Sequence, residues 1–210
     1  MFTRSLALTL SASLAVILCL SAAAEATIVS VQLANSGDGP NAAQIVNNGF
    51  DEDVDAFTDR THEWNSAGGH PTIAELGLTG ADYIKFPNDD KNVSNFTATI
   101  TMGPGLHDLY LLWDTRNSIN SWVTSLGFVN TGDDIGVDES GDGDIDNTSH
   151  VLKLEGFAGN QVVLLEENQH NGNMYGFAAQ ESVIPEPSTL LIWSLLAGLG
   201  IGVGWWRRKR

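Results

Sequence analysis

Short apolar or alternating runs of residues, separated by turn signals, constrain the fold of this chain more than any other feature of its sequence. The runs are four to seven residues long and recur at roughly ten-residue spacing, with glycine and Asn-Asp clusters between several of them. Short strands with regular turns are typical of antiparallel sandwiches and jelly rolls. The sequence therefore predicts an all-β fold, a single antiparallel β-sandwich or jelly roll. The predicted strands cover residues 28–33, 83–86, 96–102, 109–113, 151–154, 161–165 and 174–179.

The run 109–113 is apolar throughout, which is expected of a strand that is buried on both faces. Trp113, at the end of this run, is predicted to belong to the core. Arg116 follows Asp114 by two residues. An ion pair between them that fixes the neighbouring loop is favoured over a role in ligand binding. One short helix is predicted, over residues 72–76.

Charge is distributed unevenly along the chain. Ten basic and 26 acidic residues give the 210-residue chain a net charge of −16. Between Glu25 and Val183 the imbalance is larger, because five basic residues face 25 acidic ones and the net charge is −20. A surface this acidic repels phosphate backbones, so a nucleic-acid partner is not expected, whereas divalent cations would be attracted. Cys19 is the only cysteine, so neither an intramolecular disulfide nor a cysteine-ligated metal site can form.

Residues 1–24 have the organisation of a secretory signal peptide. Arg4 is followed by an uncharged run over 5–20 and by small residues up to Ala24. These are the basic, apolar and cleavage-site regions that a signal peptidase recognises. Cleavage is expected after Ala24, with Ala26 as the neighbouring option. The alternative is an N-terminal membrane anchor, for which the apolar run is short.

The C-terminal residues predict a single transmembrane helix. Residues 190–206 carry no charge, and four cationic residues, 207–210, follow them. As a helix, the uncharged segment would span about 26 Å at 1.5 Å per residue, which suffices once flanking residues contribute. The cationic tail is expected to stay in the cytoplasm. The signal peptide and this helix together therefore place the intervening domain, residues 25–182, outside the membrane.

Residues 183–210 resemble the PEP-CTERM sorting signal of bacterial proteins. The motif is Pro185, Glu186 and Pro187, and the short membrane helix and the arginine-rich tail follow it in order. The resemblance implies that an exosortase, a membrane-embedded sorting protease, cuts near the motif. The protein would then pass from the inner membrane to the cell surface or the extracellular matrix, in a system associated with exopolysaccharide and biofilm. The alternative is a plain C-terminal anchor in which Pro-Glu-Pro occurs by coincidence.

A second resemblance covers residues 81–179. The segments 82–84, 88–91, 109–116 and 127–135, together with Trp122, are similar to a sandwich module of secreted bacterial proteins. The module looks like the galactose-binding-like jelly rolls that are appended to polysaccharide-active proteins. This resemblance implies carbohydrate binding or a spacer role without catalysis. It assigns no sugar-binding residue, because the binding residues of such modules lie in variable loops.

An acidic, glycine-containing segment predicts a calcium loop. Short oxygen-bearing side chains alternate around a glycine turn, as Ca²⁺ coordination requires. The twelfth position, where an EF-hand has a bidentate glutamate, is Ser149, so a calcium-bound loop in a β scaffold is favoured over a helix-loop-helix EF-hand. The alternative is a solvated acidic turn. The candidate ligands are Asp138, Ser140, Asp142, Asp144 and Asp146.

The sequence gives no sign of catalytic machinery. His62-Glu63 and His70 lack the spacing of a zinc-protease helix, and no G-x-S-x-G nucleophile turn occurs. Trp64 and Trp122 lie in polar surroundings and are candidate sugar platforms, although a core position is the competing interpretation for Trp122.

The sequence thus predicts an exported, exosortase-sorted surface or matrix protein with a non-catalytic, carbohydrate-binding or structural β-sandwich. The alternative function is that of a secreted polysaccharide-active hydrolase.

Overall fold

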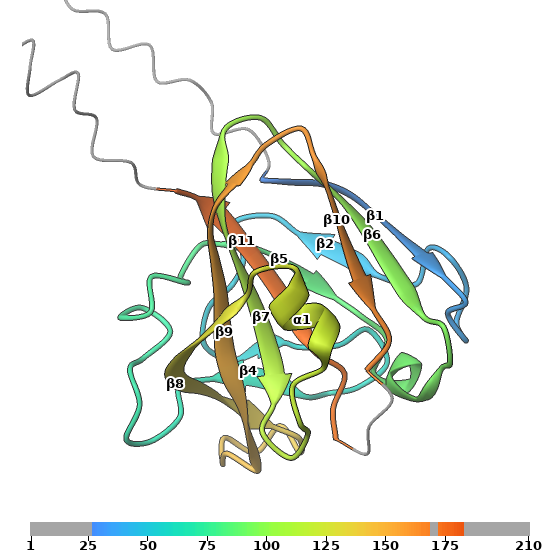
Figure 1. Ribbon diagram of the computed structural model, residues 1–210. Coiled ribbons are helices and arrows are strands. Elements are labelled where there is room, and N and C mark those ends of the chain that lie inside the picture. The colour runs from blue at the N-terminus through green and yellow to red at the C-terminus, as the bar shows by residue number, and fades with distance from the viewer. Residues whose placement is uncertain (1–26, 169–171, 183–210) are drawn as a thin grey trace, which may run out of the picture.

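The computed structural model describes residues 27–168 and 172–182 (Figure 1). The predicted signal peptide, the Pro185–Pro187 motif and the predicted transmembrane segment all lie outside these residues. Within the described ranges, no helix combines the length and the apolar character needed to cross a membrane.

Two antiparallel sheets form the domain, and all nine strand pairings in the described ranges are antiparallel. This arrangement confirms the prediction of an all-β sandwich. The smaller sheet consists, in spatial order, of β1 (Ile28–Ala34), β6 (Thr97–Met102) and β10 (Val162–Glu166). The larger sheet consists of β2 (Gln44–Val46), β5 (Asp82–Lys85), β11 (Gly176–Glu181), β7 (Leu106–Asp114), β9 (Asn147–Ala158), β8 (Val129–Asp138), β4 (Glu63–Asn65) and β3 (Val54–Asp55).

The smaller sheet has one buried and one solvent-facing side. Along β6, Ala98, Ile100 and Met102 are buried, whereas the three threonines between them are half-buried. This alternation follows from the two-residue period of a strand. The buried side chains join the same core cluster as Leu109 and Leu111 of the larger sheet. Figure 1 shows the two sheets as adjacent layers.

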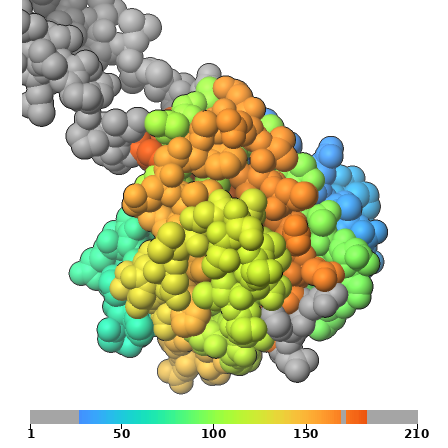
Figure 2. All heavy atoms as spheres, viewed as in Figure 1, coloured from blue at the N-terminus to red at the C-terminus, as the bar shows by residue number. Residues whose placement is uncertain are grey.

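Strand β7 is buried on both faces, as its apolar run predicts. Every residue from Leu109 to Asp114 is buried. On one face, Trp113 stacks on Tyr175, with ring centroids 5.8 Å apart and an interplanar angle of 9°. Trp122 of α1 (Ser121–Ser125) meets both rings edge-on. Figure 1 shows α1 in front of the strands, and its atoms occupy the centre of the view in Figure 2.

A second aromatic group covers the opposite face of β7. Gly176 pairs with Leu112, so these two residues lie on the same face of the sheet. This face is opposite to that of Trp113, because successive residues of a strand point to opposite sides. The ring of Trp64 packs against Gly176, and Phe50 and Phe57 lie within 6.4 Å of this ring, centroid to centroid. The β4 edge of the larger sheet, together with Phe50 and Phe57, therefore covers part of the same sheet's outer face.

The seven predicted strands are all present, with boundaries shifted by a few residues. Four strands were not predicted, because β2, β3 and β4 are only two or three residues long and β8 is rich in polar residues. The prediction of a helix over 72–76 is wrong, because residues 73–77 form a hydrogen-bonded turn in which the Leu76 N–H donates to the Thr72 oxygen at 2.9 Å and Gly77 has a positive φ of 72°. The 3₁₀ helix η1 (Asn88–Asn92) and α1 were also not predicted.

Replacing Gly176 with alanine should destabilise the domain. An added Cβ would lie 2.5 Å from Cζ2 of Trp64 and 3.1 Å from Cδ1 of Leu112, so the indole would have to shift. We expect a loss of about 1–3 kcal/mol in the free energy of unfolding, measured by chemical denaturation. Gly68→Ala is the control, because a Cβ there would meet no heavy atom within 4 Å. Equal stability of the two variants would contradict this packing.

Candidate functional site

A groove of about 590 Å³ opens on the outer face of the larger sheet, over β7, β9 and β11. Trp64, Phe50 and Phe57 do not line this part of the sheet, and the turn that contains Glu75 forms one wall of the groove. The volume of the groove lies within the range of about 300–1,000 Å³ that is common for ligand sites. The side chains that give the groove its chemistry are Glu75, Asp108, Tyr110, Lys153, Glu155 and Gln180.

Strand register brings the floor of the groove together. Asp108 pairs with Gln180 of β11, and Tyr110 pairs with Lys153 of β9. Paired residues share a face, and positions two apart along a strand do so as well. These four side chains consequently project to the same side of the sheet, although they lie up to 72 positions apart in the chain.

Tyr110 forms the buried base of this groove. Its side chain is 3% exposed, and its hydroxyl oxygen accepts a hydrogen bond from Nε2 of Gln180 at 2.9 Å. The Lys153 ammonium lies 5.5 Å from the ring centroid, within cation–π range. Burial raises the pKa of the Tyr110 hydroxyl, so it stays neutral across the physiological pH range.

Lys153 is held between two carboxylates. Its ammonium lies 2.9 Å from Oδ2 of Asp108 and 3.0 Å from Oε1 of Glu155. Burial alone would lower the pKa of Lys153, but these two contacts outweigh it and raise the pKa above its usual value. Burial would likewise raise the pKa of Asp108, yet hydrogen bonds from Ser182, Lys153 and Gly156 hold it below its usual value.

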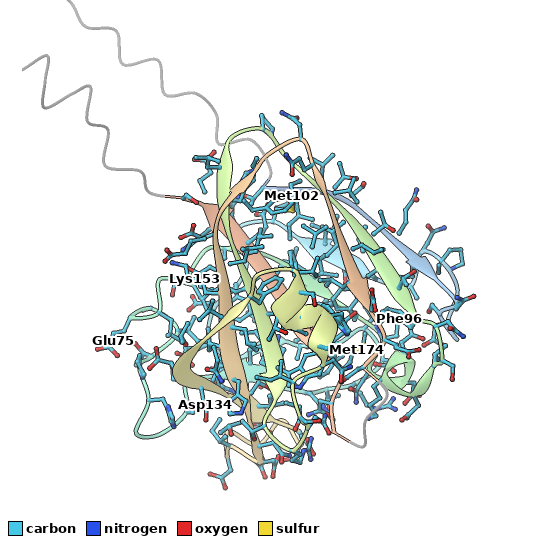
Figure 3. The ribbon with its side chains drawn as sticks, viewed as in Figure 1. Glu75, Phe96, Met102, Asp134, Lys153 and Met174 are labelled. Atoms are coloured by element: carbon cyan, nitrogen blue, oxygen red, sulfur yellow. The ribbon has the colours of Figure 1, made fainter. Side chains whose placement is uncertain are left out.

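The wall that carries Glu75 is a self-capped turn. The main-chain N–H and the hydroxyl of Thr72 donate to Oε2 of Glu75 at 2.9 and 3.0 Å, and the Glu75 N–H donates back to the Thr72 hydroxyl. This reciprocal pattern is a capping box. Both hydrogen bonds from Thr72 lower the pKa of Glu75, and the main-chain bond has the larger effect. In Figure 3, Glu75 on its turn and Lys153 lie on the same side of the molecule.

A second hollow of about 450 Å³ adjoins the groove. It is lined by Val129 and Thr131 of β8 and by Leu154 of β9, and it shares Lys153 and Glu155 with the groove. The paired Lys153 and Glu155 therefore line both hollows.

Trp64 was predicted to be an exposed sugar platform, and this prediction is wrong. Its side chain is 1% exposed and packs against Gly176, because β4 pairs with β8 and turns the indole onto the sheet. Trp122 is half-buried. Its ring meets Trp113 and Tyr175, and its Nε1 donates to the main-chain oxygen of Glu167 at 3.2 Å. The competing core interpretation of Trp122 thus describes it better.

The acidic loop after β8 turns its first carboxylate inward. Buried Asp138 accepts hydrogen bonds from the main-chain N–H groups of Ser140, Gly141 and Gly143 at 2.6–2.9 Å. Burial alone would raise the pKa of Asp138, but these bonds outweigh it and lower the pKa. Asp146 accepts from the Glu139 N–H at 2.8 Å, so these oxygens already have partners within the loop.

No group of three or more histidine, cysteine or acidic side chains in the described ranges is arranged to hold a metal ion. The remaining candidates, Asp142 and Asp144, are joined by a bond from the Asp144 N–H to Oδ1 of Asp142 at 3.1 Å. Three of the five candidates do meet, because Oγ of Ser140 lies 3.3 Å from Oδ1 of Asp138 and 3.5 Å from Oδ2 of Asp146. Calcium binding by the loop therefore stays a prediction from the sequence.

The expected ion pair between Arg116 and Asp114 is present. Nε of Arg116 lies 2.9 Å from Oδ1 of Asp114, and Nη2 also reaches Glu139 at 2.9 Å. Burial would raise the pKa of Asp114, but hydrogen bonds from Arg116 and Asn173 lower it. Because Asn173 also donates to Glu139 at 2.8 Å, this cluster ties the β7 end to the loops that follow β8 and precede β11.

A histidine–aspartate contact was not predicted from the sequence. Nδ1 of His150 lies 2.7 Å from Oδ1 of Asp134, and the Asp134 N–H donates to Nδ1 of His70 at 3.2 Å. Figure 3 places Asp134 on β8. The hydrogen bond between Asp134 and His70 attaches the segment before Glu75 to β8 of the larger sheet.

Asp90 carries an unusual buried carboxyl group. It is fully buried in η1, and Oδ1 accepts from the Gly37 N–H at 2.8 Å. No hydrogen-bond donor among the described residues reaches Oδ2. Burial raises the pKa of Asp90 even though hydrogen bonds from the Ser36 side chain and the Gly37 N–H act in the opposite direction.

No protein-family model and no curated protein matches this chain. Among solved structures, a β-glucuronidase from glycoside hydrolase family 2 is similar in part. It has a TM-score of 0.53 and 20% sequence identity, and the match covers 71% of this chain and 14% of that chain. The chain thus corresponds to a small share of that enzyme, and at this identity the likeness shows the β-sandwich fold alone.

Asp90→Asn should stabilise the protein at neutral pH. The pKa of the Asp90 carboxyl is higher in the folded protein than in the unfolded chain. The protein is therefore most stable at a pH below the unfolded-state pKa, where the carboxyl is protonated in both states. Stability falls as the pH rises through the folded-state pKa. Asparagine keeps an acceptor for Gly37 and removes the buried charge. At a pH above the folded-state pKa of Asp90, we expect the variant to have a higher Tm than the wild type. At acid pH, the difference in Tm should be smaller. Asp133→Asn on β8 is the control, and a pH-independent difference would contradict the assignment.

Proposed function

We propose that this chain is an exported, surface-sorted protein whose β-sandwich binds carbohydrate without cleaving it. The groove on the larger sheet is the observation that supports binding. It is open, it has a partly apolar floor at Tyr110, and carboxylate, ammonium and amide groups surround that floor. A few placed polar groups around an apolar surface are what fixes a small polar ligand. The β-sandwich shared with part of a glycoside hydrolase is compatible with such a role.

The acid groups of the groove favour binding over hydrolysis. Glycoside cleavage requires one carboxylic acid that keeps its proton near neutral pH so that it can protonate the leaving oxygen. Asp108 and Glu75 both have lowered pKa values, so both are ionised there. Asp108 is in addition committed to Lys153. We therefore keep the hydrolase as the alternative function and expect no release of new reducing ends from polysaccharides.

Gln180→Ala should weaken oligosaccharide binding by the full-length protein in detergent about three- to tenfold, the usual worth of one hydrogen bond. Gln180 lines the groove and positions the Tyr110 hydroxyl. Dissociation constants for a panel of neutral oligosaccharides, measured by calorimetry, provide the readout. Gln32→Ala on the exposed side of β1 is the matched control. Absence of binding to every oligosaccharide, or equal loss in both variants, would contradict the proposal.

Sorting is proposed from the C-terminal sequence alone. If an exosortase acts at Pro185–Pro187, the native protein should begin at Glu25, lack residues after about 187 and occur outside the membrane. Intact mass and cell fractionation measure this directly. Replacing Pro185 and Pro187 with alanine should leave the chain in the membrane. A wild-type species that ends at Arg210 and stays in the membrane would show a tethered domain and exclude sorting.

A further inference from the structure

We propose that the groove selects sugars that carry free amino groups, such as oligomers of deacetylated hexosamine, over neutral and anionic sugars. This inference rests on the proposed carbohydrate-binding function and deepens it. It is carried by the balance of charges around the groove and by the carboxylate oxygens that the fold leaves without partners.

The groove has more negative than positive groups. Glu75, Asp108 and Glu155 line it, and Lys153 is the one cation among its described lining residues. The ammonium of Lys153 is already shared by Asp108 and Glu155. The groove therefore keeps an excess of two negative charges, inside a domain that is itself strongly acidic.

Two carboxylate oxygens remain available to a ligand. Glu75 uses Oε2 for its capping box, and Glu155 uses Oε1 for Lys153. No described residue donates a hydrogen bond to the other oxygen of either group. The Glu155 side chain is 75% exposed, so a ligand can reach it. Each free oxygen can accept a charge-assisted bond from an ammonium, which is stronger than a bond from a neutral hydroxyl.

Lys153 illustrates the environment that an ammonium finds here. The groove already holds one ammonium within 3.0 Å of two carboxylates and 5.5 Å from the ring centroid of Tyr110. A uronate would instead face the two excess negative charges of the groove and the repulsive field of the whole domain. A neutral sugar, such as an N-acetylated hexosamine, would form hydrogen bonds in the groove but would have no net charge to be attracted by the carboxylates. The order of affinity should therefore be amino sugar, neutral sugar, uronate.

The test compares three hexasaccharides on the full-length protein: glucosamine, N-acetylglucosamine and galacturonate oligomers. At about pH 6 free carboxylates are ionised, and the sugar amines carry their protons. We expect the glucosamine oligomer to bind about tenfold more tightly than its acetylated counterpart at low salt. This advantage should shrink in about 1 M salt, where the Debye length is about 3 Å.

Glu75→Gln and Glu155→Gln should each reduce affinity for the glucosamine oligomer several-fold, and by clearly more than they reduce affinity for the acetylated oligomer. Glutamine at position 75 can still complete the capping box, so the wall is retained. Glu166→Gln on β10 is the matched control, because it removes the same charge from the smaller sheet.

The outcomes separate the two proposals. If the acetylated oligomer binds as tightly as the glucosamine oligomer and depends on Gln180, the groove binds carbohydrate and the amine preference is wrong. If Glu166→Gln weakens glucosamine binding as much as Glu155→Gln, the attraction belongs to the whole acidic surface and not to the groove, which also overturns the inference. If no oligosaccharide binds, the proposed function itself fails.

Discussion

The burial of β7 on both faces is the constraint on which the rest of this structure depends. A strand that is apolar on both sides needs a layer on each side, because exposed apolar surface is unfavourable in water. The smaller sheet and α1 cover one face, and Trp64 with its aromatic neighbours covers part of the other. At Asp108 and Tyr110 this second cover ends. The groove is thus the uncovered remainder of a face that is otherwise closed.

The same strand explains why the groove is charged. Once the aromatic layer stops, the positions that continue the outward face of β7 and its neighbours must be compatible with water. Lys153 and Asp108 meet this requirement as an ion pair, and the Lys153 ammonium lies 5.5 Å from the ring centroid of Tyr110. The electrostatics of the candidate site are therefore a consequence of where the hydrophobic cover ends. Affinity for an amino sugar would exploit the carboxylates that this pairing leaves over.

Sequence reasoning recovered the β fold because strand periodicity is a local signal. The apolar run of β7 and the alternation of β6 predicted both strands and their burial. Trp64 was misassigned because its neighbours Glu63 and Asn65 are polar, while its burial depends on β4 pairing with distant β8. The groove could not be predicted for the same reason. Its wall comes from Glu75 and its floor from three strands whose register is set only in the folded sheet.

The turn around Glu75 has a further consequence for the evolution of such domains. Its bonds are local: Thr72 and Glu75 close one end, and a pair of main-chain bonds, from Gly77 to Ala74 and from Leu78 to Ile73, closes the other. Ile73 and Leu78 are nevertheless fully buried in the core, so a replacement turn has to keep two apolar side chains at these places. Substitutions that reshape the groove without unfolding the sheet should therefore concentrate at the exposed positions of this turn, Thr72, Ala74 and Glu75.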